Sequence, residues 1–362
     1  MSNRYIGVLV NDSWYRRIPT GRMFHESLEC YETAGRLHGV VPCFFRLKDI
    51  KPGQSHVAAY IKLNGRYQKC VIPVPQVIHN RTLYKVKRPK LAIRRLVADG
   101  KTIYNEWNRY GKKTIHDILQ LNPEIRPHLP ATREATPQTV KEMMNQFDKL
   151  ILKPNSGSIG RGIMKLERTE AGWRLFGAMK PASRPIPFRD RLPTVLLKKI
   201  RTRSYLVQQL LPLATVHGNP FDLRVSVQRG PTGQWTISGI VGKMARPKAY
   251  ITNVARGGTV LTLEQILAAH PQMSPSDVRQ SVERFSLQVA EQLSRHLPHM
   301  ADIGLDIGLT EFGFPMFIEC NGRDLRYSFR KGNLHDAFQA VYSNPIGYGK
   351  YLLETKGAVQ PT

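Results

Sequence analysis

Two short stretches near the C-terminal end of the chain carry the residue types best suited to hold a metal ion. In residues 303–309, strand alternation puts Asp306 on the same face as Gly304 and Gly308, which leaves room for a ligand beside the carboxylate. In residues 316–321, Glu319 and Asn321 share one face. The loop between them is short enough for a hairpin, so we expect a set of oxygens that suits Mg²⁺ together with phosphates. For either strand alone, the alternative is a set of polar residues that cap a turn.

A second group of candidate residues follows a strand expected at 150–153. Lys153 ends that strand, and a loop of glycines and serines comes next, with Ser156, Gly157, Ser158 and Gly160. Backbone N–H groups of such a loop can cradle phosphate oxygens, and the lysine adds a positive charge at the edge. The loop is neither a Walker A motif nor a dinucleotide fingerprint, because no Gly-Lys-Ser/Thr follows and strands flank it. A flexible hairpin stays the alternative interpretation.

A third candidate is the strand expected at 221–228. Alternation places Asp222 and Arg224 on one face, where the guanidinium could hold a phosphate or carboxylate through two hydrogen bonds. A structural Asp–Arg pair on the surface of a sheet is the alternative. Downstream, Lys243, Arg246 and a Gly-Gly pair fall within sixteen residues, which is a plausible loop for handling anions.

Length and composition exclude several classes of protein. The chain has 362 residues, of which 41% are hydrophobic, enough for two or three folded domains of roughly 100–200 residues. Its four cysteines are scattered without a Cys-x-x-Cys spacing, and no apolar run approaches the length of a membrane helix. A disulfide scaffold, a membrane protein and a zinc module are therefore excluded. We expect a soluble protein of a reducing, cytoplasmic compartment, with no membrane partner.

The charge of the chain points to an anionic partner. Lys and Arg number 54 against 27 Asp and Glu, which gives a formal net charge of +27. Many of the cations fall within residues 81–95 and 184–203. Nucleotide phosphates, nucleic acid and acidic polymers are all candidate partners, and a merely solvated face is the alternative for each cluster. Neither cluster has the regular aromatic residues of a single-strand stacking platform, so nucleic acid is the least favoured partner.

The pattern of expected elements divides the chain into units of α/β class. A strand, a helix and a strand at about 5–10, 25–37 and 41–47 predict an N-terminal α/β domain over residues 1–100. Strands with glycine loops follow from residue 150, and a long amphipathic helix begins near Ser274. We expect a second domain over 101–335, with a glycine-loop subdomain at about 135–210 and a metal-site subdomain at about 211–335. Residues 336–362 are expected to form a C-terminal helix and tail.

The order of these motifs resembles the ATP-grasp fold across residues 100–330. It also resembles the YheC/YheD family of endospore coat-associated proteins across nearly the whole chain. The segments that carry this resemblance are 77–81, 129–133, 152–163, 221–225, 318–321 and 344–352. The resemblance implies an ATP-grasp domain preceded by an N-terminal α/β pre-ATP-grasp domain, and an association with spore coat components.

The resemblance also implies roles for the candidate residues around a bound ATP. Lys153 and Lys113 would contact the nucleotide, although the neighbouring Lys112 is hard to separate from Lys113. The glycine loop would close over the phosphates, and the hinge at Gln208, Gln209 and Leu211 would contact adenine. Asp306, Glu319 and Asn321 would hold one or two Mg²⁺ ions, while Arg224 and Arg246 would stabilise the transferred phosphoryl group. The implied reaction phosphorylates a carboxylate and lets an amine attack it, which gives an amide, ADP and phosphate.

The chain departs from many ATP-grasp ligases after the Glu-x-Asn motif, where it has the charged segment 322–326. Two interpretations stay open: the added charge selects an acidic substrate such as a peptide or polymer, or it only solvates the loop. Three functions also stay open. A carboxylate–amine ligase is favoured, a coat-associated protein that keeps the fold without turnover comes second, and a nucleic-acid-binding protein comes third.

Overall fold

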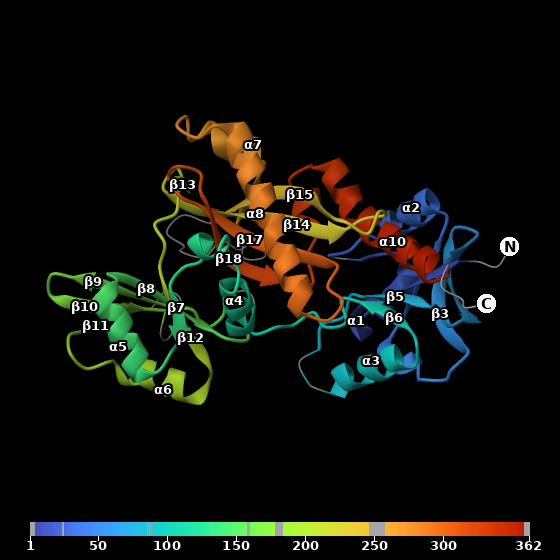
Figure 1. Ribbon diagram of the computed structural model, residues 1–362, viewed down its shortest axis with the longest axis horizontal. Helices are drawn as coiled ribbons and strands as arrows, with labels where there is room; N and C mark the ends of the chain where they lie inside the picture. Colours follow the sequence, from blue (N-terminus) through green and yellow to red (C-terminus); the bar gives the residue numbers. More distant parts are fainter. Residues whose placement is uncertain are drawn as a thin grey trace.

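The computed structural model describes residues 4–23, 25–84, 86, 88–157, 160–177, 184–245 and 258–357. Within these residues the chain forms three six-stranded sheets, and the third sheet lies between the first and the second (Figure 1). Among the described helices, none is long and apolar enough to cross a membrane.

The first sheet contains the residues at the N-terminal end of the chain. Its strands are β1 (Tyr5–Leu9), β2 (Val41–Phe45), β3 (His56–Leu63), β4 (Arg66–Pro73), β5 (Val77–Asn80) and β6 (Thr102–Tyr104). They follow the order β4-β3-β2-β1-β5-β6, in which β1 pairs in parallel with β2 and β5, and β5 with β6. The sheet extends just past residue 100, the predicted end of the N-terminal domain.

Helices cover this sheet, and the last helix of the chain is one of them. They are α1 (Asp12–Tyr15), α2 (Leu28–His38), α3 (Arg88–Ala98) and α10 (His335–Gly357), with short 3-10 turns at Ile18–Thr20 and Leu47–Asp49. Helix α2 begins later than predicted because the Ser27 side chain caps it by accepting a hydrogen bond from the Cys30 N–H. Helix α10 packs against α2 and shares a hydrophobic core with β1. The two ends of the described chain therefore form one packed unit.

The second sheet is antiparallel in all its pairs and follows the order β11-β10-β9-β8-β12-β7. Its strands are β7 (Thr132–Glu134), β8 (Lys149–Pro154), β9 (Met164–Thr169), β10 (Gly172–Phe176), β11 (Ile186–Phe188) and β12 (Tyr205–Gln209). Helices α5 (Pro137–Gln146) and α6 (Thr194–Thr202) share its hydrophobic core. Helix α5 starts at a capping box between Thr136 and Thr139, with Pro137 in its first turn.

The third sheet is also antiparallel and follows the order β16-β15-β14-β17-β18, with β13 paired to β14. Its strands are β13 (Thr215–Val216), β14 (Asn219–Arg229), β15 (Trp235–Met244), β16 (Thr259–Leu261), β17 (Asp302–Leu309) and β18 (Pro315–Asn321). The helices near it are α4 (Lys112–Gln120), α7 (Leu263–Ala268), α8 (Pro275–His296) and α9 (Tyr327–Lys331), with a 3-10 turn at Arg126–His128. Helix α8 buries the predicted apolar stripe against the sheet.

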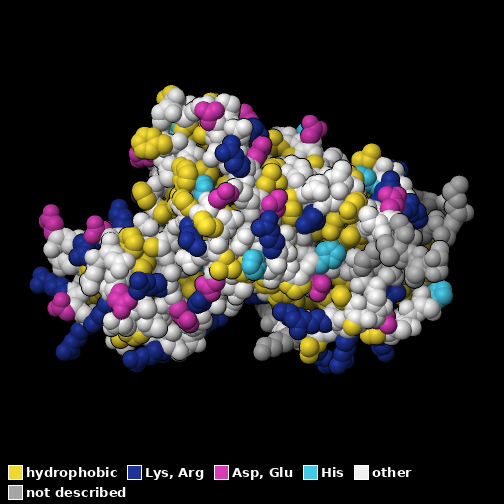
Figure 2. All heavy atoms as spheres, in the orientation of Figure 1, with side chains coloured by type: hydrophobic (Ala, Val, Ile, Leu, Met, Phe, Trp, Pro, Cys, Tyr) yellow, Lys and Arg dark blue, Asp and Glu magenta, His cyan; other side chains and the backbone are white. Residues whose placement is uncertain are grey.

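The basic residues of the two predicted clusters lie mainly on the surface. Lys and Arg side chains gather along the lower edge of the molecule, over α6 on one side and α3 on the other (Figure 2). Arg94 and Arg95 of α3 and Lys198 and Arg201 of α6 are exposed. Arg81 is the exception, because it is buried and paired with carboxylates.

Candidate active site

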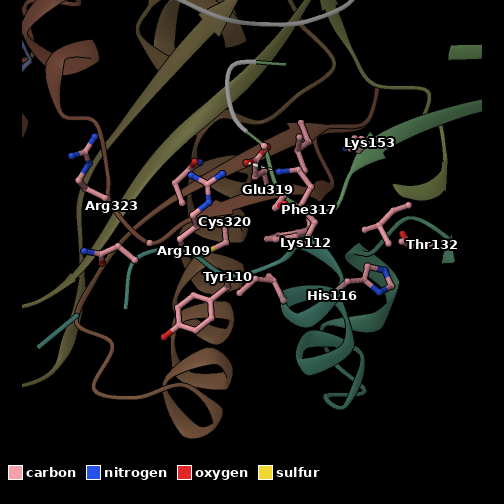
Figure 3. A pocket seen from close by; sticks show the side chains of 18 of the residues that line it. Arg109, Tyr110, Lys112, His116, Thr132, Lys153, Phe317, Glu319, Cys320 and Arg323 are labelled. Carbon is pink, nitrogen blue, oxygen red and sulfur yellow. Dashed lines mark hydrogen bonds and ion pairs between the residues drawn. The ribbon is translucent and has the colours of Figure 1, made fainter. Parts of the chain in front are cut away.

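A cleft between the second and third sheets gathers nearly all of the predicted site residues. Lys153 and Gln208 line it from the second sheet, and Glu319 lines it from the third. Figure 3 shows Lys153 and Glu319 at this cleft. The other predicted residues that line it are Ser156, Gly157, Gly160, Gln209, Leu211, Arg224, Asp306 and Asn321. Ser158 and Arg246 lie outside the described residues. The cleft is therefore bordered by the glycine loop on one side and by the acidic hairpin on the other.

The hairpin of β17 and β18 brings the predicted metal ligands together. Asp306 and Glu319 are direct cross-strand partners, and the next pair on this face is Gly304 with Asn321. The Asn321 side-chain amide lies 3.3 Å from Asp306 Oδ2, to which it donates a hydrogen bond. A one-residue bulge leaves Ile318 without a partner on β17, and such bulges re-aim neighbouring side chains. The alternation predicted from the sequence thus holds at the three ligand positions.

Two cations hold the Asp306 carboxylate. Arg224 donates from Nε to Asp306 Oδ1 at 2.8 Å, and Lys243 Nζ lies 2.8 Å from the same oxygen. Burial by itself raises the pKa of Asp306, but Arg224 and Lys243 outweigh it and hold this pKa at about 2. Lys243 Nζ also lies 2.7 Å from Asp222, whose pKa is raised to about 7 by burial, with Asp306 acting in the same direction. Asp306 is therefore ionised at neutral pH and already neutralised by protein cations.

The sequence analysis placed Lys243 in a loop and gave it no partner. Its position opposite Asp222 in a hairpin is nevertheless a pattern that indicates an ion pair. Lys243 pairs directly with Asp222 across β14 and β15, so the two side chains share a face of the sheet. Both residues are almost fully buried. An Asp and a Lys at directly paired positions of a hairpin would have identified this contact.

The space that alternation predicts over Gly304 and Gly308 is filled by other side chains, although Asp306 itself lines the cleft. A Cβ atom on Gly304 would lie 2.8 Å from Asp324 Cγ and 3.0 Å from Arg224 Nη1. A Cβ atom on Gly308 would lie 2.5 Å from Leu213 Cδ1. The two glycines make room for side chains of the same chain, because Asp324, which follows β18, and Leu213, which precedes β13, lie over the strand. Strand alternation predicts which face a side chain takes but not what lies above it.

The structure places Lys112, rather than Lys113, in the cleft. Lys112 lines the cleft and its Nζ lies 2.9 Å from Glu319 Oε1. Lys113 Nζ instead pairs with Asp117 Oδ2 at 2.6 Å, and both of these side chains are about half exposed. Lys112 stands three and seven residues before Ile115 and Leu119, which are buried, so it belongs to the inward face of α4. That spacing was available in the sequence and separates the two lysines.

The glycine loop is tied to α4 by its first residue. The Asn155 carbonyl accepts a hydrogen bond from Lys112 N at 3.0 Å, and its side-chain oxygen accepts one from Lys113 N at 3.0 Å. The first turn of α4 therefore donates its free N–H groups to the start of the loop. This contact joins the glycine loop, which follows β8 of the second sheet, to α4, which packs with the third sheet and carries Lys112.

The hinge residues Gln208, Gln209 and Leu211 line the cleft. Thr132, which contacts Gln208, lies on the side of the cleft away from Arg323 (Figure 3). The Gln208 side chain donates from Nε2 to Thr132 Oγ1 at 2.8 Å, so its amide is oriented by the neighbouring strand β7. Gln209 N donates to the Ala131 carbonyl and Leu210 N to the Lys149 carbonyl. Gln208 is almost fully buried, whereas Gln209 and Leu211 are partly exposed at the cleft.

Lys153 leads us to expect that anion binding in this cleft depends on pH. Loss of water around Lys153 lowers the pKa of its ammonium group to about 8, and the neighbouring Lys112 acts in the same direction, against Glu319 and Asp306. The protonated form binds phosphates better, so we expect the affinity for ADP to fall as the pH rises above about 8. Calorimetry in two buffers of different ionisation enthalpy should detect proton uptake on ADP binding at that pH. Lys153→Arg, which keeps its charge, should remove this pH dependence; an unchanged profile would contradict the assignment.

The oxygen donors at the hairpin fit Mg²⁺ when phosphates are also present. Among the described residues no group of three or more His, Cys, Asp and Glu side chains could hold a metal, so the set is limited to two carboxylates and the Asn321 amide. Those carboxylates already contact Arg224, Lys243 and Lys112. Because Mg²⁺ usually keeps few protein ligands and binds through phosphates, the set suits a metal that arrives with a nucleotide.

A cleft between two antiparallel sheets, with a glycine loop on one side and an acidic hairpin on the other, is the arrangement of an ATP-grasp protein. The chain belongs to the YheC/D-like ATP-grasp family, whose model matches residues 100–352. Both the family and the α/β ATP-grasp fold predicted from the sequence are therefore confirmed.

Relatives and solved structures agree with this assignment. Endospore coat-associated protein YheD of Bacillus subtilis (strain 168) is 26% identical over 332 residues, which cover 86% of this chain and 71% of that protein. Endospore coat-associated protein YheC of the same organism is 21% identical over 312 residues, which cover 84% of this chain and 86% of that protein. The VanG D-Ala:D-Ser ligase of Enterococcus faecalis has a similar fold, with a TM-score of 0.54, 9% identity and coverage of 96% of this chain and 100% of that chain.

Proposed function

We propose that the chain is an ATP-dependent carboxylate–amine ligase that binds ATP and Mg²⁺ in the cleft between the second and third sheets. One observation carries this proposal: Lys153 and the glycine loop face Asp306, Glu319 and Asn321 across the same cleft, and Lys112 lies beside Glu319. Cations and backbone N–H groups on one side suit phosphates, and oxygen ligands on the other side suit the metal that phosphates bring with them.

The residues of the cleft would act by positioning and by charge neutralisation. Mg²⁺, held by Asp306, Glu319 and Asn321, would neutralise the phosphate oxygens. Lys153 and Lys112 would hold the phosphates, and Gln208, Gln209 and Leu211 would border the adenine. Arg224 would stabilise charge on the phosphoryl group as it moves from ATP to a carboxylate, and Arg246 is proposed for the same role. An amine then attacks the acyl-phosphate, the amide bond forms and phosphate leaves.

The test of this proposal is calorimetric titration of the full chain with ADP in the presence of Mg²⁺. We expect binding in the micromolar range, and we expect Lys112→Ala to weaken it at least about tenfold, because a charge-assisted hydrogen bond to phosphate is lost. Lys113→Ala is the matched control, since it removes the same charge one residue away from an exposed pair. We expect the control to change the affinity less than about twofold.

Two results would contradict the proposal. If the native chain did not bind ADP at millimolar concentration, the proposed nucleotide site would be wrong. If Lys112→Ala and Lys113→Ala lost equal affinity for ADP, the assignment of Lys112 to the cleft would be wrong. Binding of ADP then justifies a screen of paired acids and amines for ADP release from ATP, with Glu319→Ala as the site-defective control.

A second candidate function is a coat-associated protein that binds nucleotide without turnover. The names of the two Bacillus relatives favour it, since both are called endospore coat-associated. The two functions differ in one observable: the ligase releases ADP when the correct acid and amine are present, whereas the binding protein does not. Association with the coat is tested by the recovery of the chain in the coat fraction of purified spores.

A further inference from the structure

The charged segment that follows β18 crosses the boundary between the cleft and the first sheet. Its first residue is held against the neighbouring backbone, because a Cβ atom on Gly322 would lie 2.9 Å from the Asn108 carbonyl oxygen. The Asn105 side chain also donates to the Gly322 carbonyl at 2.9 Å. The segment therefore has a defined path, and the three charged side chains that follow take different directions.

Two of these charged side chains are used inside the protein. Asp324 is fully buried and accepts a hydrogen bond from Arg224 Nη1 at 2.8 Å, and the Ser226 hydroxyl also donates to it. Arg326 is fully buried and lies 2.7 Å from Asp302 Oδ2. Asp324 and Arg326 thus neither solvate the loop nor reach a substrate. Asp324 instead helps to position Arg224 in the cleft.

Arg323 differs from the other arginines of this region because it lacks a carboxylate partner. Its Nη1 makes two long contacts, at 3.4 Å to the Asn11 side-chain oxygen and 3.4 Å to the Arg81 carbonyl, and the guanidinium lies 5.8 Å from the centre of the Trp14 ring. Its Nε is buried and donates to no acceptor among the described residues. In that part of the chain it forms no ion pair, whereas Arg81, Arg224 and Arg326 each contact at least one carboxylate. A partly buried guanidinium with unused donors has a strong tendency to bind an anion.

Arg323 lines the cleft at the end away from the hinge. Figure 3 shows Arg323 and Lys153 on opposite sides of Glu319, so this predicted metal ligand lies between the two cations. A phosphoryl group held near Glu319 would therefore have the nucleotide on one side and Arg323 on the other. The second substrate of a phosphoryl transfer has to approach from the side opposite the nucleotide, which is the side of Arg323.

The surface beyond Arg323 is also basic. Leu83 lines the cleft, and the chain runs from it into α3, where Arg88, Arg94 and Arg95 are exposed. Arg94 lies close enough to Glu106 to act on the pKa of that carboxyl, and Figure 2 shows Lys and Arg side chains gathered over this part of the surface. An extended anion that occupied the cleft at Arg323 would find further cations along its path.

We propose that Arg323 binds a carboxylate of the acceptor substrate and that this substrate is an acidic peptide. The proposal rests on the proposed ligase function, since it assigns the substrate class of the same cleft. The planar guanidinium of arginine pairs with a carboxylate through two parallel hydrogen bonds. Arg323 is thus a residue for substrate binding, and the cations of α3 extend the site to a chain of several carboxylates.

The experiment is titration of the full chain with triglutamate and with trialanine, each in the presence of Mg²⁺ and ADP. We expect triglutamate to bind and trialanine not to bind. Arg323→Met should weaken triglutamate about 10–100-fold, the usual effect of losing a charge-assisted pair of hydrogen bonds. Arg323→Lys should recover only part of the affinity, because an ammonium group lacks the planar pair of donors. Arg330→Met, which removes the same charge from an exposed position of α9, is the matched control and should change the affinity less than about twofold.

The outcomes separate this inference from the proposed function. If the native chain binds Mg²⁺ and ADP but binds triglutamate no better than trialanine, the inference is overturned and the nucleotide site stands. Equal affinities of Arg323→Met and Arg330→Met for triglutamate would also overturn it. If the native chain binds no ADP, the ligase function fails, but triglutamate binding that depends on Arg323 still supports the anion site. Inorganic phosphate that competes as well as triglutamate would overturn the assignment to carboxylates.

Discussion

Asp302→Asn is expected to lower the free energy of unfolding by about 3–5 kcal/mol, the usual cost of removing one partner from a buried ion pair. Asp302 is fully buried and lies 3.0 Å from Arg81 Nη1 and 2.7 Å from Arg326 Nη2. Both guanidinium groups are buried, so without Asp302 their only remaining carboxylate among the described residues would be Glu26. The measurement is urea unfolding of the full chain followed by circular dichroism.

The matched control for this variant is Asp117→Asn. It makes the same chemical change in the exposed pair with Lys113, where we expect a loss of about 0.3–0.5 kcal/mol. A loss below about 1 kcal/mol for Asp302→Asn would contradict the buried cluster and would indicate that water or a rearranged Glu26 replaces the carboxylate.

The same carboxylate makes the protein sensitive to acid. Burial by itself raises the pKa of Asp302, but Arg326 and Arg81 outweigh it and hold the pKa well below its usual range. A lowered pKa gives stability that is present above the pKa of the unfolded chain, about 3.9, and is lost as the pH falls below it. The acid limb of the unfolding curve should therefore be shallower in Asp302→Asn.

This cluster connects the two ends of the chain to the cleft. Glu26 and Arg81 come from the first sheet and its connections, Asp302 begins β17, and Arg326 precedes α9. The Arg81 guanidinium also donates to the Asp324 carbonyl at 2.7 Å, next to the side chain that holds Arg224. Stability and the geometry of the candidate site therefore share one buried network, and damage to one should affect the other.

The local part of this site was predictable from the sequence, and the long-range part was not. Strand alternation and a short loop are properties of neighbouring residues, so they placed Asp306 and Glu319 correctly on paired strands. The Asp324 carboxylate over Gly304 depends on how the chain turns after β18, and the Arg81–Asp302 contact joins residues 221 positions apart; one sequence contains no period or spacing for either. The choice between Lys112 and Lys113 was partly predictable. The spacing of buried residues in α4 indicates that Lys112 faces inward, but it does not indicate that Glu319 is its partner.

The fold followed the same division. The amphipathic stripe of α8 and the capping residues of α2 and α5 are local signals, and the structure has helices at those places. The packing of α10 on α2 joins the last helix to the first unit, which no composition shift between residues 1–100 and 336–362 indicates. Recognising the order of motifs supplied the ATP-grasp fold as a whole, because order along the chain captures topology that single motifs do not.

Glu319→Gln is expected to weaken the binding of ADP in the presence of Mg²⁺ by at least about 10–100-fold, the loss that even outer-shell partners of a metal cause. The stability of the chain should hardly change, because the Glu319 side chain is 31% exposed and its pair with Lys112 is partly solvated. The measurement is calorimetric titration with ADP, with Mg²⁺ and with EDTA, alongside urea unfolding. Without Mg²⁺ the native chain and the variant should bind ADP with similar affinity.

Asp306→Asn removes the facing carboxylate and provides the decisive comparison. It should lose the same Mg²⁺-dependent affinity, but it should also destabilise the chain by about 3–5 kcal/mol, because Arg224 and Lys243 are buried and share this carboxylate. One variant thus tests the metal alone, and the other tests the metal together with the buried ion pairs. If Glu319→Gln kept the full Mg²⁺-dependent affinity while Asp306→Asn lost it, the hairpin would hold the cations of the cleft rather than a metal. Such a result would mean that Mg²⁺ is bound by the phosphates of the nucleotide and not by the side chains of the hairpin.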